Sequence, residues 1–176
     1  AKKFGFNAEI LFHERPLYVP KDSHLVKTLS EVDTYGIKIG LETMGKINQL
    51  GSLEEVMELC SLDDRLLPTI DFGHLNARNL GGVFVTSDDY LRVFDKISRN
   101  ISPDVANRLH CHFSKIEWTD KGEKRHLTFE DTVYGPNFEP LAWALKKFGL
   151  EPVVICESAG TQDVDAVKMQ KIYFGN

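Results

Sequence analysis

The chain alternates between short, continuously apolar runs and longer stretches with apolar residues at helical spacing. Five apolar runs have the length of a buried strand and cover residues 7–13, 37–43, 66–71, 109–115 and 152–157. Helices are predicted over residues 23–35, 53–60, 88–98, 138–148 and 161–173. Continuously apolar strands are typical of a parallel sheet that is covered on both faces. The alternation therefore predicts an α/β protein with parallel strands and crossover helices.

Two connecting segments are predicted to be loops. Residues 79–82 are polar and rich in glycine, and residues 117–125 are mostly charged. A sixth, weaker candidate strand covers residues 124–129. One helix boundary has a specific signal, because Ser52 and Glu55 have the spacing of a capping box at the start of the predicted helix 53–60.

Each apolar run ends in, or is closely followed by, residues that bind divalent metals. These residues are His13, Glu42, Asp71 with His74, His110 with His112, and Glu157. Because the carboxyl ends of parallel strands meet at one rim, the side chains are expected to lie close together. Imidazole and carboxylate ligands in combination suit zinc, manganese or iron better than calcium. The sequence thus predicts a metal centre, and five strands that supply one mouth favour a barrel over an open sheet.

Side-chain alternation along the strands indicates which way these candidates point. Glu42 has the opposite parity to the apolar residues of its run, so it is expected to face the barrel axis while they face helices. His110 and His112 are two residues apart and therefore share a face. Glu157 shares parity with branched residues that commonly fill a barrel interior, which permits an inward position.

The same residues also have structural interpretations. Asp71 could cap a helix, Glu42 could form a structural ion pair, and Glu157 could hydrogen-bond the loop that follows it. Taken singly, His13 and His126 are more often hydrogen-bonded structural residues than metal ligands. Their combined position at matching strand ends favours the metal interpretation.

The charged segment that precedes and includes His126 is the second informative region. His126, with Glu123 nearby, could complete the metal shell from above. Lys115 and Arg125 could hold a phosphate group. The alternative is an ordinary solvated loop.

Composition narrows the class of protein without naming it. The 176 residues are 42% hydrophobic and 27% charged, as in an ordinary globular domain, and no apolar stretch is long enough to span a membrane. The three cysteines are far apart, which favours reduced thiols and a cytoplasmic location. The net charge of −5 gives no general basic surface for nucleic acid, although bound cations would reverse the field locally.

From about residue 7 to its end, the chain resembles the endonuclease IV group of apurinic/apyrimidinic endonucleases, in the xylose-isomerase-like TIM-barrel superfamily. The matching segments are Ile-Leu-Phe-His13, Gly-Leu-Glu42-Thr-Met-Gly-Lys, Thr-Ile-Asp71-Phe-Gly-His74, His110-Cys-His-Phe-Ser-Lys115, Arg125-His126 and Val-Ile-Cys-Glu157-Ser. The resemblance implies an α/β fold of the (β/α)8 barrel type. It also implies metal ligands at His13, Glu42, Asp71, His74, His110, His126 and Glu157.

The chain departs from the family pattern in three respects. It supplies only the carboxyl-terminal two-thirds of the barrel, as one domain over residues 1–176, without the amino-terminal strands. A missing amino-terminal segment or self-association is expected to close the barrel. Lys124 occupies a position where the family has an aspartate, so Glu123 would have to substitute, and His112 stands where the family more often has an amide.

Three functions are compatible with these residues. The preferred hypothesis is a phosphodiesterase with two or three Zn²⁺ ions, or Mn²⁺, that cleaves DNA 5′ to abasic sites, with Glu42 and Glu157 as catalytic residues. The second is a metal-dependent sugar isomerase or epimerase, in which the same two glutamates would act next to a carbonyl group. The third is a barrel fragment that binds a metal or a partner without catalysis.

Overall fold

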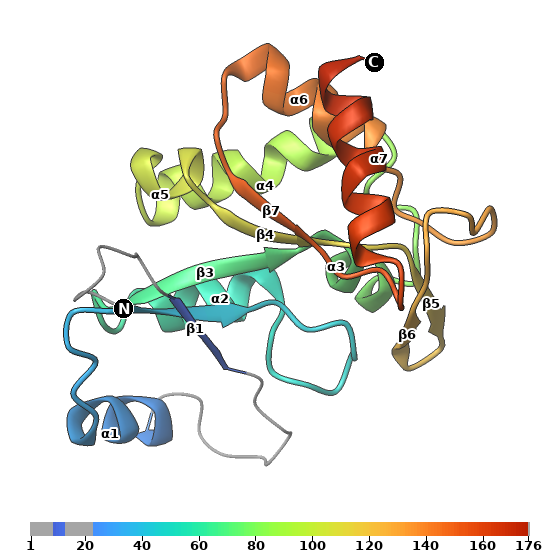
Figure 1. Cartoon of the computed structure of the whole chain (residues 1–176). Coiled ribbons are helices and arrows are strands. Elements are labelled where there is room, and N and C mark those ends of the chain that lie inside the picture. Colours follow the sequence, from blue (N-terminus) through green and yellow to red (C-terminus); the bar gives the residue numbers. More distant parts are fainter. Residues whose placement is uncertain (1–8, 13–22, 176) are drawn as a thin grey trace.

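The computed structural model describes residues 9–12 and 23–175, and its main sheet consists of five parallel strands in the order β1-β2-β3-β4-β7. The strands are β1 (Glu9–Phe12), β2 (Lys38–Glu42), β3 (Leu66–Asp71), β4 (His110–Phe113) and β7 (Val153–Cys156). The helices are α1 (Ser23–Glu31), α2 (Leu53–Cys60), α3 (Phe72–Arg78), α4 (Ser87–Asn100), α5 (Pro103–Asn107), α6 (Glu139–Phe148) and α7 (Gln162–Phe174). Figure 1 shows the strands side by side, with α2 beside β3 and α7 beside β7.

One face of the sheet packs against the helices. Ile39 and Leu41 of β2 pack in one cluster with apolar residues of α2. A larger cluster joins Ile70 of β3 and Phe113 of β4 to the buried Tyr90 of α4 and to apolar residues of α6. The predicted parity of β2 is therefore confirmed, because its apolar residues face helices.

The other face of the sheet is open at β7, the last strand in the order given above. Val153 and Ile155 of β7 are 54% and 42% exposed, whereas Val154 and Cys156, which have the opposite parity, pack against the larger core cluster. In a closed barrel this face would be the interior. The parallel sheet with crossover helices confirms the predicted α/β fold, here a partial TIM barrel.

The charged segment 117–125 is a β-hairpin, which corrects two predictions. β5 (Ile116–Thr119) and β6 (Gly122–His126) pair in antiparallel fashion, in a small sheet separate from the main one. The segment predicted as a loop is thus largely strand, and the sixth candidate strand, 124–129, does not extend the parallel sheet. Exposed charged residues of the hairpin, such as Lys124 and Arg125, conceal the strand signal in the sequence.

Several element boundaries also differ from the predictions. The helix predicted over 23–35 ends at Glu31, because Tyr35 and Gly36 adopt positive φ angles of 51° and 73° and turn the chain into β2. Helix α3 was not among the predicted helices, and it begins directly where β3 ends. Helix α2 matches its predicted bounds, with the capping box of Ser52 and Glu55 formed. No helix of the described residues has the length and apolar character that crossing a membrane requires.

Candidate metal centre

Four candidate ligands gather where the parallel strands end. Glu42, Asp71, His112 and Glu157 each offer one ligand atom, and these atoms all lie within 4.8 Å of one another. We call these four residues the strand-end group. The Nδ1 atom of His112 lies 3.0 Å from Oε1 of Glu42 and 3.2 Å from Oε1 of Glu157. Three carboxylates and one imidazole therefore converge on one point.

Burial strengthens the electrostatic interactions between the side chains of this group. The side chains of Glu42 and His112 are 0% and 2% exposed, whereas that of Glu157 is 31% exposed. Burial alone would raise the pKa of Glu42, but hydrogen bonds from His112 and His74 outweigh it and lower the pKa to about 2. Burial raises the pKa of Glu157, and the negative charges of Asp71 and Glu42 raise it further, against the opposing effect of His112. The two glutamates thus differ in proton affinity.

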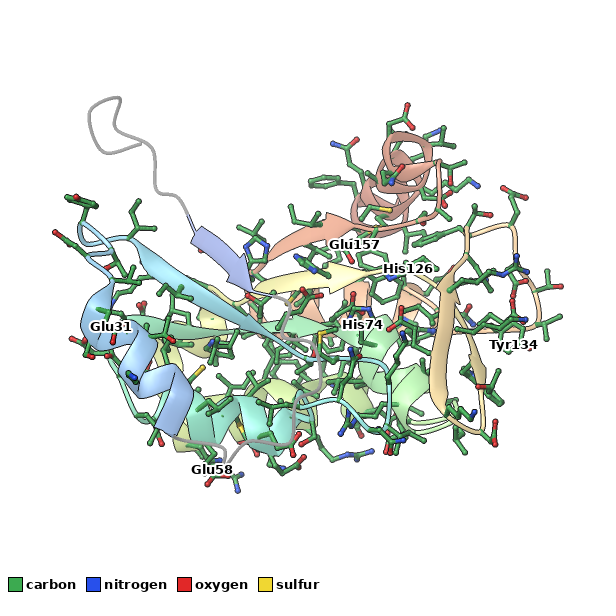
Figure 2. All side chains as sticks on the ribbon, turned by 90° about the horizontal axis from the view of Figure 1, so that it is seen from below. Glu31, Glu58, His74, His126, Tyr134 and Glu157 are labelled. Atoms are coloured by element: carbon green, nitrogen blue, oxygen red, sulfur yellow. The ribbon has the colours of Figure 1, made fainter. Side chains whose placement is uncertain are left out.

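A second candidate group lies beside the first and uses the hairpin. His74, Glu123 and His126 also offer ligand atoms within 4.8 Å of one another, and we call them the hairpin group. The Oε atoms of Glu123 lie 3.4 Å from Nε2 of His74 and 3.7 Å from Nε2 of His126. Figure 2 shows His74, His126 and Glu157 close together, with Glu31 and Glu58 at the far side of the molecule.

Hydrogen bonds fix both imidazole rings of the hairpin group. Nδ1 of His74 lies 2.9 Å from the carbonyl oxygen of Thr43, and a carbonyl only accepts, so this nitrogen carries a proton and Nε2 faces Glu123. Nδ1 of His126 lies 2.9 Å from the Ser114 hydroxyl, which leaves its Nε2 toward Glu123 as well. Orientation of this kind by neighbouring residues is usual for metal-binding histidines.

His74 connects the two groups. Its Nδ1 lies 3.4 Å both from Oε1 of Glu42 and from Oδ2 of Asp71. Burial would lower the pKa of His74, but the charges of Asp71, Glu42 and Glu123 outweigh burial and raise the pKa to about 10. In the metal-free protein the protonated His74 therefore partly balances the carboxylates, and a bound cation would take over this role.

Asp71 provides a direct test of whether the residues fit a metal. Its Oδ1 accepts a 2.7 Å hydrogen bond from the backbone N–H of His74 and caps helix α3. Its Oδ2 is fully buried and accepts no hydrogen bond from a described residue. A buried carboxylate oxygen that accepts no hydrogen bond is costly, and a bound cation would satisfy it. Asp71 is thus a helix cap, and its second oxygen has the position of a metal ligand.

Two backbone hydrogen bonds and the close approach of one glycine hold the hairpin against the segment 45–47. The N–H of Glu123 donates to the carbonyl of Gly45 at 2.9 Å, and that of Ile47 donates to the carbonyl of Lys121 at 3.2 Å. Gly122 has a φ of +86°, and a Cβ atom there would lie 2.3 Å from the Gly45 carbonyl oxygen. Glycine at position 122 therefore permits the backbone approach that brings Glu123 to His74.

The remaining sequence candidates lie elsewhere. His13 is outside the described residues. His110 begins β4, with its ring 5.3 Å from that of His112, and it belongs to neither group found among the described residues. Lys115 donates from Nζ to the backbone carbonyl of Asp131, and Arg125 is ion-paired with Glu117 at 2.6 Å. The phosphate-binding role of these two cations remains a prediction.

His112 and Glu123, which are not among the metal ligands implied by the family resemblance, each lie in a group. The sequence did not indicate the two residues that orient the histidine rings, Thr43 and Ser114. Both are fully buried. Ser114 has the same parity as His112, two residues along, and that spacing was the signal available for it.

A parallel α/β barrel-type sheet with acidic and imidazole side chains at its carboxyl ends defines the class of protein. The chain belongs to the xylose isomerase-like TIM barrel family, whose family model matches residues 22–171. A protein of Methanocaldococcus jannaschii named uncharacterized protein MJ0133 is 31% identical over 153 residues, which are 86% of this chain and 54% of that protein. The chain thus spans about half the length of this relative.

A solved structure supports the same fold. A chain in the crystal structure of AsfvAP:AG matches 97% of this chain and 64% of its own length, with a TM-score of 0.64. Its 16% sequence identity supports a shared fold alone. The family membership and this likeness together confirm the predicted superfamily and the partial TIM barrel.

Proposed function

We propose that the protein is a metal-dependent phosphodiesterase of the endonuclease IV type, which cleaves DNA 5′ to abasic sites. The observation that carries the proposal is the adjacency of the strand-end and hairpin groups. They are joined through His74, whose two ring nitrogens face one group each. Adjacent cation sites are the usual arrangement for phosphodiester hydrolysis, in which metals lie about 3.5–4 Å apart.

The donor chemistry fits zinc or manganese. The strand-end group supplies three carboxylates and one imidazole, and the hairpin group supplies two imidazoles and one carboxylate. When bound, such ions would activate a water molecule and neutralise charge on the phosphate. Two or three Zn²⁺ ions, or Mn²⁺, are therefore the proposed cofactors, with His110 and His13 as further proposed ligands.

The two glutamates have different roles in this proposal. Glu42 is fully buried and has a low pKa, so it remains a carboxylate that holds an ion. Glu157 is partly exposed and has a raised pKa, which suits a residue that orients water and accepts a proton from it. Lys115 and Arg125 would leave their present partners to contact the phosphate.

Incision of abasic DNA tests the proposal. Full-length protein loaded with Zn²⁺ is incubated with an end-labelled duplex that contains one tetrahydrofuran abasic analogue. We expect a cut on the 5′ side of the analogue, and a rate at least ~100-fold lower for Glu157→Gln. Glu58→Gln, an exposed glutamate on α2, is the matched control and should cleave normally. A metal-loaded protein that leaves the duplex intact would overturn the proposal.

A sugar isomerase or epimerase is the second candidate, favoured by one observation. Both cations expected to bind phosphate are engaged by other parts of the chain, through Asp131 and Glu117. A neutral sugar would need no such cations, and the strand-end group alone could hold a single ion. Turnover of simple ketoses with Mn²⁺, together with inactivity on abasic DNA, would select this function.

A further inference from the structure

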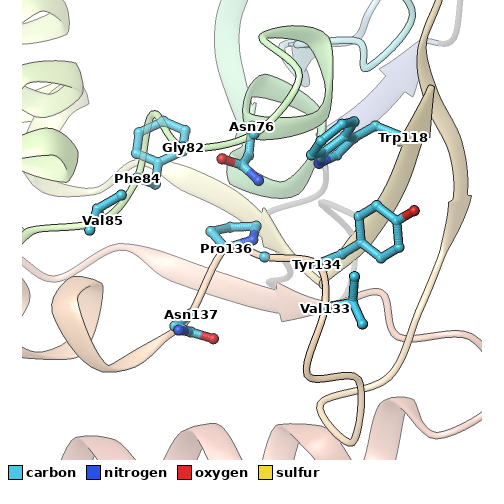
Figure 3. Close-up of a pocket in the computed structure, with 11 residues that line it drawn as sticks. Asn76, Gly82, Phe84, Val85, Trp118, Val133, Tyr134, Pro136 and Asn137 are labelled. Carbon is cyan, nitrogen blue, oxygen red and sulfur yellow. The ribbon is translucent and has the colours of Figure 1, made fainter. Parts of the chain in front are cut away.

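A pocket of about 220 Å³ lies beside the hairpin group, outside the metal centre. Its walls come from α3 and the turn after it, from β5 and from the segment 133–137. Figure 3 shows Asn76, Trp118, Tyr134 and Pro136 around this space. Pockets for drug-sized ligands measure roughly 300–1,000 Å³, so this one suits a single ring system.

The chemistry of the walls restricts the occupant. Trp118 and Tyr134 form an edge-to-face pair with ring centroids 5.4 Å apart, and Phe84 and Pro136 contribute further flat apolar surface. None of the eleven lining residues carries a charged side chain. A phosphate or carboxylate would find no counter-charge here, whereas an uncharged planar ring would find surfaces on which to stack.

One polar side chain, that of Asn76, can add hydrogen bonds to the stacking surfaces of the pocket. Asn76 is 3% exposed and lines the pocket, and its Nδ2 atom lies near the opposite wall, 3.7 Å from where a Cβ atom at Gly135 would be. Its carboxamide can therefore hydrogen-bond a molecule that occupies the pocket. A carboxamide offers one donor and one acceptor side by side, and the edge of a nucleobase presents the complementary pair.

The position of Trp118 is fixed by a glycine. Gly81 has a φ of +84°, and a Cβ atom there would lie 2.8 Å from Cζ2 of the indole ring. The backbone at Gly81 therefore packs directly against the indole. Trp118 is a rigid wall of the pocket and does not need to be ordered by the ligand.

The pocket is tied to the metal centre through two of its walls. Asn76 follows His74 by two residues on α3, and Trp118 is the cross-strand partner of Glu123 in the hairpin. We infer that this pocket binds a nucleobase, held by stacking on the aromatic walls and by hydrogen bonds to Asn76. Its assignment to the base of the nucleotide next to the abasic site rests on the proposed function.

Tryptophan fluorescence tests base binding without metal or catalysis. The chain has two tryptophans, and Trp143 on α6 is half exposed and outside the pocket, so Trp143→Phe leaves Trp118 as the only reporter. The full-length variant is titrated with deoxyadenosine in the presence of a chelator. We expect saturable quenching by deoxyadenosine, and none by 2-deoxyribose, which lacks the base.

Substitution of Asn76 tests specificity. In the same background, Asn76→Ala should weaken deoxyadenosine binding roughly tenfold, a loss within the range for a paired carboxamide–base contact. Asn100→Ala, an exposed asparagine on α4, is the matched control and should bind normally. Circular dichroism verifies that each variant is folded.

Two results would overturn the inference: absence of saturable quenching in folded protein, or quenching by a ketose but not by deoxyadenosine. The outcome is independent of the proposed nuclease activity. A protein that binds deoxyadenosine but leaves abasic DNA intact would support the nucleobase pocket and contradict the proposed nuclease activity. A protein that cleaves abasic DNA without binding the nucleoside would support the nuclease activity and contradict the nucleobase pocket.

Discussion

The Nδ1 atom of His112 lies 3.0 Å from Oε1 of Glu42, although 70 residues and one intervening strand separate them. β2 and β4 are two strand spacings apart, which would place residues on a flat sheet roughly 9–10 Å from each other. The contact therefore requires both side chains to lean inward over β3, as they do across the curved mouth of a barrel. The strand-end group is a product of this curvature.

Loss of a single carboxylate should reveal this group as a metal site. We expect Glu42→Gln to weaken binding of Zn²⁺ by at least about 10–100-fold, because it removes a buried negative ligand. Elemental analysis and metal titration would measure the change. Glu31→Gln, on the far side of the molecule, should retain the wild-type metal content. Equal metal content in both variants would exclude Glu42 as a ligand.

Metal binding should release protons near neutral pH. The pKa of His74 is raised to about 10, so its imidazole is protonated at pH 7 and must lose the proton on Nε2 before that nitrogen can bind an ion. Metal affinity should therefore rise with pH between 7 and 10, by about tenfold per unit for each proton released. Calorimetry in buffers of different ionisation enthalpy counts those protons. Affinity that is constant over this range would contradict the prediction.

In the metal-free protein, the free energy of unfolding should decrease with rising pH because of the same residue, His74. A raised pKa means that protonated His74 stabilises the fold fully below its ordinary pKa of 6.5, and this contribution is lost as the pH rises through about 10. Denaturation by urea in the presence of a chelator, at pH 6 and pH 10, would measure the loss. His74→Gln should reduce this difference between the two pH values.

The hairpin contact predicts a selective effect of one glycine. Gly122→Ala should displace the hairpin and weaken the hairpin group, because its Cβ would collide with the Gly45 carbonyl, while the strand-end group keeps its ion. Gly149→Ala is the matched control, since Gly149 also has a positive φ of +63° but has open space around its Cβ position. Both substitutions incur backbone strain of about 1 kcal/mol. Only Gly122→Ala should lower the number of ions bound.

Asp165 should stabilise the fold in a pH-dependent way. It is 1% exposed on α7, and its Oδ2 accepts hydrogen bonds from the Phe129 N–H at 2.9 Å and the Thr161 hydroxyl at 3.0 Å. Burial would raise the pKa of Asp165, but these bonds and others outweigh it, so the pKa lies below its usual 3.8. Asp165→Asn should therefore reduce the free energy of unfolding by about 1–3 kcal/mol at pH 7.

The sign of the shift sets the pH range of that loss. A carboxylate with a lowered pKa stabilises the fold above pH 4, and this contribution disappears as the pH falls through the folded-state value. The difference in free energy of unfolding between wild type and Asp165→Asn should thus shrink as the pH falls below 4. Asp163→Asn, an exposed aspartate on the same helix, should differ little from wild type at either pH.

Local signals were sufficient for most of the sheet. The predicted strand 66–71 and helix 53–60 have the bounds of β3 and α2, because a buried apolar run and a capping box are determined by neighbouring residues. The hairpin of β5 and β6 could not be read in this way. Its strands carry exposed charges, and its stability depends on contacts with Gly45 and α3 that lie far away in the sequence.

The candidate site was likewise predictable from the sequence only in part. Parity placed His110 and His112 on one face, but parity cannot tell how far along the strand a side chain lies. That depth depends on the register between strands, which pairs His112 with Asp71 and His110 with Thr69. His112 therefore lies level with Asp71 at the end of β3, and His110 lies level with Thr69, two residues earlier. Such a register is a property of the assembled sheet.

The docked hairpin also implies an order of assembly. Glu123 and His126 both come from β6, so the hairpin group is complete only after Gly122 has settled against the Gly45 carbonyl. The strand-end group depends on the main sheet alone. A newly folded chain is therefore expected to acquire its first ion at the strand ends and the next one later. Transient release of the hairpin would let that later ion exchange with the solvent while the first is retained.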